Sequence, residues 1–334
     1  MRVHVLHHAN CFDGAASSAI FAAFYRARID ATAQFVYVPK QHRPGDPFVA
    51  DDFAADDVAI LDFRYTTQPR LGWFFDHHAS AFQLPGERAH FEAEGSTRKF
   101  YDPRAPSCAG FVAASAATHF GFDPTPHAEL LRWAELIDSA AFPDPTMPVT
   151  LADPALRLMT FAEQNRDLAL VGRFIEDLID RPFAELAFAD YVADTLEPVL
   201  ERHQGDIALL ADRCDARAGV VEFNLLDQPP RAYNKFIPYY HHPTIRYVVG
   251  LSIGPDGSIK LTAGYNPWLP RDGREHDISA LCERFGGGGH PYVGGASFGP
   301  DGFAEALDAQ RLIAEVLRGA EGVRGAHAVR GAEG

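Results

Sequence analysis

The chain has 334 residues, of which 47% are hydrophobic and 22% are charged, and these are ordinary values for a globular protein. They exclude a disordered, collagen-like or disulfide-scaffold protein, and at about 150 residues per domain the length predicts roughly two domains. With 30 Lys and Arg against 45 Asp and Glu, the net charge is −15, which disfavours binding to long duplex nucleic acid or to an anionic membrane.

The four cysteines are scattered, without the Cys-x-x-Cys spacing of a zinc knuckle and without the pattern of a disulfide framework. This use of cysteine fits a reducing compartment. The first residues, MRVHVLHHAN, lack the features of a signal peptide, and no run approaches the ~18 apolar residues of a membrane helix. We therefore expect a cytoplasmic protein without a membrane partner.

The first part of the chain, residues 1–150, alternates short apolar runs with helical or loop segments. A strand is predicted at Val3–His7, followed by an alanine-rich helix led by Gly14. Further strands are predicted at Gln34–Val38, Val58–Phe63 and Trp73–Phe75. This order is typical of an α/β fold with a doubly wound, mainly parallel sheet.

The second part predicts a helical connector over residues 151–205 and a smaller α/β domain with a mixed sheet over residues 206–318. Its last helix should end near Arg318, and residues 319–334 repeat a Gly/Ala-rich unit that predicts a flexible tail. The strands of this domain are expected at Ile207–Leu210, Gly219–Phe223, Arg246–Ile253 and Ser258–Ala263.

Metal-binding side chains follow three of the predicted strands. They are His7 and His8, Asp62, and the run Asp76, His77 and His78. Because ligands bind at the carboxyl ends of strands in open α/β sheets, we expect these groups to meet in one crevice. Imidazole and carboxylate ligands suit Mn²⁺, Zn²⁺ or Fe²⁺, and a shared carboxylate could bridge two ions about 3.5–4 Å apart. The pattern predicts a two-metal hydrolase.

Each of these residues alone has a structural explanation. A single His at a strand end is more often a hydrogen-bonded surface residue, and a single Asp there is more often a turn or helix cap. The Asp-His-His run follows a buried strand, however, where three polar groups are costly unless a metal or a hydrogen-bond network satisfies them. Strand alternation lets one of His7 and His8 point inward, and we favour His8 with His7 as the alternative.

Asp138 ends a predicted helix, His127–Ile137. The helix macrodipole disfavours an acid at that end, so we expect a cation nearby. Ser107 is a suitable N-cap for another predicted helix, and we expect its role to be structural.

Together these motifs resemble the DHH phosphoesterase superfamily with its associated C-terminal domain, which includes nano-RNases, dinucleotide phosphodiesterases and exopolyphosphatases. The resemblance covers both predicted domains, but the helical middle matches little. It is carried by HANCFDG from His8 to Gly14, Asp62 in ILDF, Asp76-His77-His78, Asp138 in WAELID, and GGGGH at Gly286, Gly287, Gly288, Gly289 and His290.

The resemblance implies that Asp62 bridges two metal ions, usually Mn²⁺, with Mg²⁺, Zn²⁺ or Fe²⁺ as alternatives. Asp13, His77 and Asp138 would complete one ion site, and His8 would serve the other. Asp76 would orient the imidazoles, as metal-bound histidines require. His78 would face the substrate phosphate and donate a hydrogen bond or a proton while water activated by the metal attacks phosphorus.

One departure concerns the first loop, where Asn10 or Cys11 stands in place of a family Asp. The first metal site would then be poorer in carboxylate, would hold a different ion, or would stay empty until substrate arrives. Cys11 could bind a softer ion as a thiolate. A small buried cysteine is commoner, so we expect a structural Cys11.

The glycine-rich run after the predicted helix Asp277–Phe285 exposes amides that could cradle an anion. By resemblance it would grip a terminal phosphate or the base and sugar of a short nucleotide, whereas the structural alternative is a tight loop with packing glycines. Family members often carry an arginine near this loop. Here we expect it to come from Arg246 or Arg284.

The leading hypothesis is a metal-dependent phosphodiesterase that hydrolyses short oligonucleotides or dinucleotides, with catalysis in the first domain and substrate anchoring in the second. An exopolyphosphatase or pyrophosphatase is one alternative. A nucleotide-binding sensor with a decayed metal site is another, motivated by Asn10 and Cys11. A homodimer is compatible with the sequence.

Overall fold

The computed structural model describes residues 1–41, 45–230, 232–254 and 256–319. The chain forms two compact units, Met1–Phe142 with Leu151–Val199, and Pro143–Thr150 with Leu200–Gly334. The helices that follow Leu151 thus belong to the first unit up to Val199, whereas the sequence predicted a separate connector over residues 151–205. The short segment Pro143–Thr150 belongs to the second unit.

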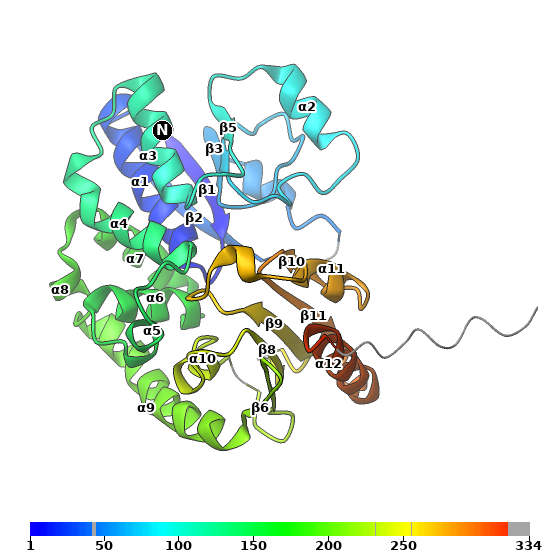
Figure 1. Ribbon diagram of the computed structural model, residues 1–334. Helices are drawn as coiled ribbons and strands as arrows, with labels where there is room; N and C mark the ends of the chain where they lie inside the picture. Colours follow the sequence, from blue (N-terminus) through cyan, green and yellow to red (C-terminus); the bar gives the residue numbers. More distant parts are fainter. Residues whose placement is uncertain (42–44, 231, 255, 320–334) are drawn as a thin grey trace, which may run out of the picture. The chain divides into compact units, whose positions relative to one another are not determined.

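The first unit is built on a parallel sheet with the strand order β2-β1-β3-β4-β5, which confirms the doubly wound fold class (Figure 1). The order places the topological switch point between β1 and β3, because the chain extends to β2 on one side and to β4 and β5 on the other. The strands are β1 (Arg2–His8), β2 (Gln34–Lys40), β3 (Asp57–Leu61), β4 (Trp73–Asp76) and β5 (Lys99–Tyr101).

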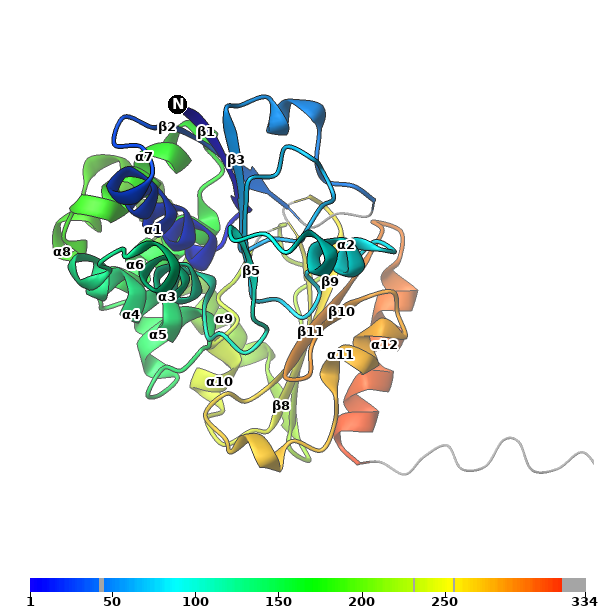
Figure 2. The same cartoon turned by 90° about the horizontal axis from the view of Figure 1, so that it is seen from above.

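Both faces of this sheet are covered, which explains why its inner strands β3 and β4 are almost wholly buried. On one face α1 (Phe12–Arg28) packs against α3 (Cys108–Phe120), and the two helices lie side by side in both views (Figure 2). The small alanine side chains of α1 let this helix approach α3 closely. The other face carries a cluster that includes Leu6, Val58 and Phe74, near η1 (Ala50–Phe53) and α2 (Glu87–Glu94).

Two of the remaining helices of the first unit, α6 (Pro154–Gln164) and α7 (Leu168–Asp180), begin at clear sequence signals. Asp153 and Asp167 are N-caps whose side chains accept from the Ala155 and Ala169 amides, both at 2.9 Å. The others are η2 (Thr125–His127), α4 (Ala128–Asp138), α8 (Phe183–Leu186) and the first part of α9 (Asp190–Arg213).

The second unit is built on a mixed sheet, as predicted, with the order β10-β11-β9-β8-β7-β6. Its β7–β8 pair is parallel and its other pairs are antiparallel. The strands are β6 (Asp215–Arg217), β7 (Val220–Asn224), β8 (Tyr247–Ile253), β9 (Ile259–Tyr265), β10 (Gly288–His290) and β11 (Val293–Phe298). The helices are α5 (Thr146–Thr150), α10 (Ile237–His241), η3 (Arg271–Gly273), α11 (Ile278–Glu283) and α12 (Phe303–Leu317).

One predicted strand is wrong, because Ile207–Leu210 lies inside α9. The last helix, α12, ends at Leu317, next to the predicted end at Arg318. Of the predicted tail 319–334, residues 320–334 lie outside the described residues.

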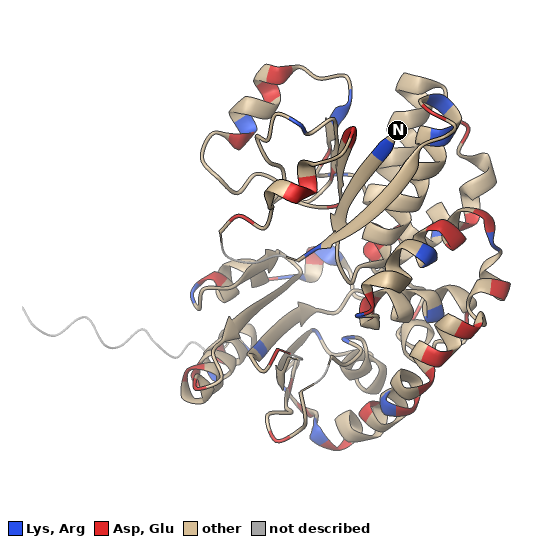
Figure 3. Ribbon diagram, turned by 180° about the vertical axis from the view of Figure 1, so that it is seen from behind, with Lys and Arg blue, Asp and Glu red and all other residues tan. Residues whose placement is uncertain are grey.

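Within the parts of the chain that the structure describes, we find no helix with the length and hydropathy that crossing a bilayer requires. Acidic and basic residues are scattered over the elements of both units (Figure 3). The net charge of −15 is therefore spread over both units.

Candidate metal centre

The predicted site residues of the first unit meet at the carboxyl edge of its parallel sheet. His8 ends β1 and Asp76 ends β4. Asp62 follows β3 directly, and its backbone N–H donates to the Phe75 carbonyl at 2.9 Å. Asp13 lies in the first turn of α1, and Asp138 is the last residue of α4.

Asp62 is the centre of this group. Its side chain is fully buried, and neither of its carboxylate oxygens receives a hydrogen bond from the described residues. Its φ of 56° is in the left-handed region, which a non-glycine residue adopts only when its surroundings impose it. Burying an ionised carboxylate without donors is costly, so the chemistry of this residue fits a cation between its neighbours.

His77 faces three carboxylates through one nitrogen. Its Nε2 lies 3.5 Å from Asp62 Oδ1, 3.4 Å from Asp138 Oδ2 and 3.8 Å from Asp13 Oδ2. Its Nδ1 lies 2.9 Å from the Ala105 carbonyl, which can only accept, so Nδ1 donates to that carbonyl and Nε2 is the nitrogen that faces the carboxylates. Of these groups, Asp13, His77 and Asp138 have ligand atoms within 4.8 Å of one another, a spacing that could hold one metal ion.

Asp13 is oriented by the start of α3. Its Oδ2 accepts from the Cys108 amide at 2.6 Å and its Oδ1 accepts from the Ala109 amide at 3.0 Å. The predicted N-cap of α3, Ser107, accepts from the Gly110 amide at 3.1 Å. These two backbone hydrogen bonds fix the Asp13 carboxylate in the orientation that faces His77.

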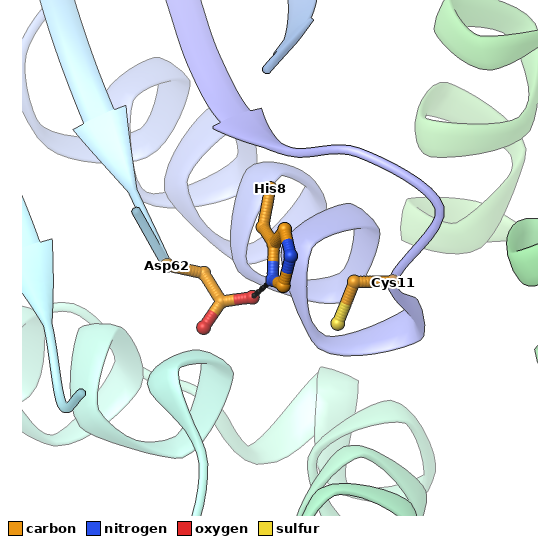
Figure 4. A group of neighbouring side chains, drawn as sticks. All are labelled: His8, Cys11 and Asp62. Atoms are coloured by element: carbon orange, nitrogen blue, oxygen red, sulfur yellow. Dashed lines mark ion pairs between the residues drawn. The ribbon is translucent and has the colours of Figure 1, made fainter. Parts of the chain in front are cut away.

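A second cluster joins His8, Cys11 and Asp62, whose ligand atoms lie within 4.8 Å of one another. Figure 4 shows the three side chains pointing toward a common space, with His8 Nδ1 3.5 Å from Asp62 Oδ2. We expected a structural Cys11, with a thiolate ligand as the alternative, and the structure places its thiol beside these two groups. His7 is buried elsewhere, with Nδ1 donating to the His8 carbonyl at 3.0 Å, so the structure brings His8 into the cluster.

Asp76 orients His78. Its Oδ1 accepts from the His78 Nδ1 at 2.7 Å and from the backbone amides of His77 and His78 at 2.9 and 3.2 Å. The sequence predicted that Asp76 orients both imidazoles, but the ring of His77 is held by Ala105. With its Nδ1–H donated to Asp76, His78 can act on a substrate through Nε2.

The buried charges perturb one another. Burial raises the pKa of Asp13, and the neighbouring carboxylates of Asp62 and Asp138 raise it further. Burial would also raise the pKa of Asp62, but its contacts with His77 and His8 hold that pKa below the usual range.

The two histidines of the DHH run respond in the opposite sense. Burial disfavours their charged forms, but the contact with Asp62 raises the pKa of His77 to about 10, and the hydrogen bond to Asp76 raises the pKa of His78 to about 9. Burial and the charge of Asp62 raise the pKa of the Cys11 thiol. Without metal, bound protons offset the negative charge of these carboxylates. Metal cations would displace those protons on binding.

Three overlapping groups of the described residues could hold an ion. They are His8, Cys11 and Asp62; Asp62, His77 and His78; and Asp13, His77 and Asp138. Asp62 and His77 each belong to two groups, which fits neighbouring ion positions that share a carboxylate.

In the second unit, the glycine-rich run has two kinds of glycine. A Cβ on Gly287 would lie 2.0 Å from the Gly295 carbonyl oxygen, and one on Gly289, which has a φ of 144°, would lie 2.3 Å from the Val293 carbonyl oxygen. These two glycines let β10 pack against β11. Around Gly286 and Gly288 nothing lies within 4 Å of such a Cβ, and His290 is exposed.

Four arginines of the second unit bear on this run. Arg246 is paired with Glu275 at 2.9 Å, and Arg284 lies over the Phe285 ring. Arg271 and Arg274, which the sequence did not single out, lie over the ring of Tyr292, 5.3 and 4.3 Å from its centre. Arg274 Nη1 is buried without a hydrogen-bond partner among the described residues. Sequence reasoning missed this cluster, because its arginines belong to a loop without a recognisable motif.

No model of a protein family matches the chain, and no curated protein matches it significantly in sequence. Solved structures do resemble it. The pGpG-specific phosphodiesterase PggH from Vibrio cholerae has 18% identity and a TM-score of 0.62, with 96% of this chain and 100% of that chain covered. The DHH domain of a protein assigned to a family of ribosomal proteins has 13% identity and a TM-score of 0.59, with 95% and 86% covered.

RecJ from Thermus thermophilus in complex with Mn²⁺ has 14% identity and a TM-score of 0.54, with 94% of this chain and 52% of that chain covered. Identities this low establish the fold. The chain has the fold of the DHH phosphoesterases, as its sequence motifs predicted.

Proposed function

We propose that this protein is a metal-dependent phosphodiesterase that hydrolyses short oligonucleotides or dinucleotides with two divalent cations, of which Mn²⁺ is the expected one. The observation that carries the proposal is the buried carboxylate of Asp62, which receives no hydrogen bond from the described residues and lies between two histidine-containing clusters. A decayed metal site would not keep this set of buried acids and imidazoles, so the proposal favours an enzyme over a sensor.

The residues divide into two ion positions that share Asp62. Asp13, His77 and Asp138 would complete one, through oxygen and nitrogen atoms that suit Mn²⁺ or Mg²⁺. His8 and Cys11 would complete the other, where a thiolate would favour a softer ion. When bound, such ions lower the pKa of water and offset the charge of a phosphate group.

The protein's own groups supply the proton chemistry. The carboxylate of Asp76 keeps His78 protonated at neutral pH, because it raises the pKa of His78 to about 9. His78 is then able to donate a hydrogen bond to a phosphate oxygen or a proton to the leaving oxygen. His77 is more enclosed than His78, with side-chain exposures of 10% and 22%, which fits a ligand and a substrate-facing role respectively.

The substrate is expected to be short. A net charge of −15 gives no long-range attraction to a polyanion, so a phosphorylated substrate must be bound by local groups. In the second unit these are the open amides around Gly288, with His290 and the arginines over Tyr292. Arginine and tyrosine suit a nucleotide better than bare polyphosphate, because both can stack on a base. One protein of the same fold, PggH, is a phosphodiesterase for pGpG.

The test is a substrate panel with Mn²⁺ that compares a dinucleotide, a 3′,5′-bisphosphate nucleotide, polyphosphate and pyrophosphate. Asp62→Asn is the diagnostic variant, because Asn tolerates a positive φ. Asp212→Asn, at an exposed position of α9, is the matched control. We expect the dinucleotide to be the preferred substrate and Asp62→Asn to lose at least a thousandfold in turnover. Preference for polyphosphate or pyrophosphate, or full activity of Asp62→Asn, would contradict the proposal.

A further inference from the structure

A pocket of about 480 Å³ in the first unit adjoins the loop that carries the metal cluster. One wall is formed by Ala9 and Asn10, which lie between His8 and Cys11 in the chain. The other walls come from the end of β2 and from the turn between α6 and α7. The volume is in the usual range for a small-molecule site, about 300–1,000 Å³.

Asn10 ties these walls together through its side chain. Its φ is 54°, in the left-handed region. Its Nδ2 donates to the Asn165 carbonyl at 2.9 Å, and its Oδ1 accepts from Gln41 Nε2 at 3.2 Å. The two neighbouring residues therefore face different sites: Cys11 lies in the metal cluster, and Asn10 lines the pocket.

The pocket also carries an uncompensated positive charge. Arg166 Nη1 donates to the Glu163 and Asn165 carbonyls at 2.8 and 3.2 Å, and Arg166 forms no ion pair with any described residue. Lys40, the other cation of the lining, is already paired with Asp52. The Nε and Nη2 side of the Arg166 guanidinium forms a fork that suits two adjacent acceptor atoms.

Two apolar side chains flank the same cavity. Leu168 is 70% exposed and Val49 is 52% exposed. Single exposed apolar residues are common, but two on opposite segments of one concave site provide surfaces for a flat ring.

We infer that this pocket is a nucleobase subsite, which holds one base of the substrate next to the metal centre. The ring would lie against Leu168 and Val49, and its carbonyl and ring-nitrogen acceptors would face Arg166. The inference rests on the proposed phosphodiesterase function and deepens it, because it places base recognition in the same unit as the proposed metal ligands.

The test uses Arg166→Gln and Leu168→Ser in the full chain, with Arg311→Gln and Leu307→Ser on α12 as matched exposed controls. Turnover with Mn²⁺ is measured on a dinucleotide and on a dinucleotide analogue that has an abasic residue. We expect each pocket variant to raise KM for the dinucleotide at least tenfold, with KM for the abasic analogue within twofold of wild type. Equal effects on both substrates, or no effect on either, would overturn the inference.

Equilibrium binding of the dinucleotide to metal-free protein separates this inference from the proposed function. We expect the two pocket variants to bind at least fivefold more weakly than the controls even without metal. If the wild type shows no turnover but this difference is present, the proposed function fails and the subsite stands. If the wild type turns over and the variants bind like the controls, the subsite fails. Thermal unfolding of the pocket variants, together with the charge-conserving Arg166→Lys, tests whether weaker binding is caused by loss of the loop structure.

Discussion

Neighbouring histidines of the DHH run differ in their roles because their hydrogen-bond partners differ. A carbonyl, that of Ala105, fixes the proton of His77 on Nδ1 and turns Nε2 toward three carboxylates. A carboxylate, that of Asp76, holds the Nδ1 proton of His78 and raises its pKa. Partner chemistry thus separates a candidate ligand from a candidate proton donor.

Replacing Asp76 by Asn tests this division. Asn keeps an oxygen that can accept from the His77 and His78 amides, but it removes the charge that holds His78 protonated. We expect Mn²⁺-dependent turnover to fall about 10–100-fold, with a smaller change in Mn²⁺ affinity. Steady-state kinetics and a metal titration measure the two effects. Unchanged turnover at neutral pH would show that His78 does not need Asp76.

Residue identities in the candidate site could be predicted where polar groups follow a buried strand. Asp62 and the DHH run carried that signal, and the structure brings them together. For Cys11 the sequence allowed both a thiolate ligand and a structural residue, because a lone cysteine has no spacing signal that separates the two. Arg274 could not be predicted, because its contact with Tyr292 depends on the course of a loop.

At the scale of elements, the approach of α1 to β1 depends on one glycine. A Cβ on Gly14 would lie 2.4 Å from the His8 carbonyl oxygen, which is backbone that cannot give way cheaply. A larger residue than glycine would therefore clash at position 14. Gly14 lets α1 start directly beside the cluster of His8 and Cys11.

Gly14→Ala should destabilise the fold by about 1–3 kcal/mol through this overlap. It should also weaken Mn²⁺ binding, because the displaced backbone carries His8. Gly205→Ala on α9 is the matched control, since nothing lies within 4 Å of its added Cβ. There we expect stabilisation by about 0.5–1 kcal/mol. Denaturant unfolding measures both, and equal effects of the two substitutions would refute the steric argument.

A second element contact predicts a pH dependence. Glu176 of α7 accepts from Arg26 of α1 at 2.7 and 2.8 Å and from Tyr37 of β2 at 2.7 Å. Burial opposes its charge, but these donors hold its pKa below the ordinary 4.5. The pairing therefore stabilises the fold above that ordinary pKa, and the stabilisation is lost as the pH falls through the lower folded-state value.

Glu176→Gln should accordingly lower the free energy of unfolding by about 1 kcal/mol at pH 7, a modest loss because the pair is partly exposed. At pH 3 the difference from wild type should shrink. Urea unfolding at the two pH values measures it. A loss that is equal or larger at pH 3 would show that the charge of Glu176 is not what ties α7 to α1.

Elements with regular apolar patterns were predictable, and those with polar buried faces were not. β1 and α1 follow the pattern closely. Ile207–Leu210 has the appearance of a short apolar strand but belongs to α9, whose buried face there is made by His203, Asp206 and Leu210. Two of these three residues are polar, so the helical period is hidden from a reading of hydrophobic residues.

At the scale of the whole molecule, the sequence predicts two α/β parts but not where they divide. Helices α6 to α8 pack with the first unit, and Pro143–Thr150 contributes to the second. Helices α6 and α7 have the amphipathic pattern of any surface helix, so their sequence does not indicate which unit they join. The strongly acidic balance, by contrast, is visible in the sequence alone and limits the substrates that the molecule can attract.

We expect the buried acids and imidazoles of the first unit to hold divalent cations around Asp62. Calorimetric titration of Mn²⁺ into chelator-stripped protein tests it most directly, with wild type and Asp62→Asn compared. We expect two ions per wild-type chain and a loss of at least a hundredfold in affinity in the variant. No Mn²⁺ binding by the wild type, or equal binding by Asp62→Asn, would contradict the account.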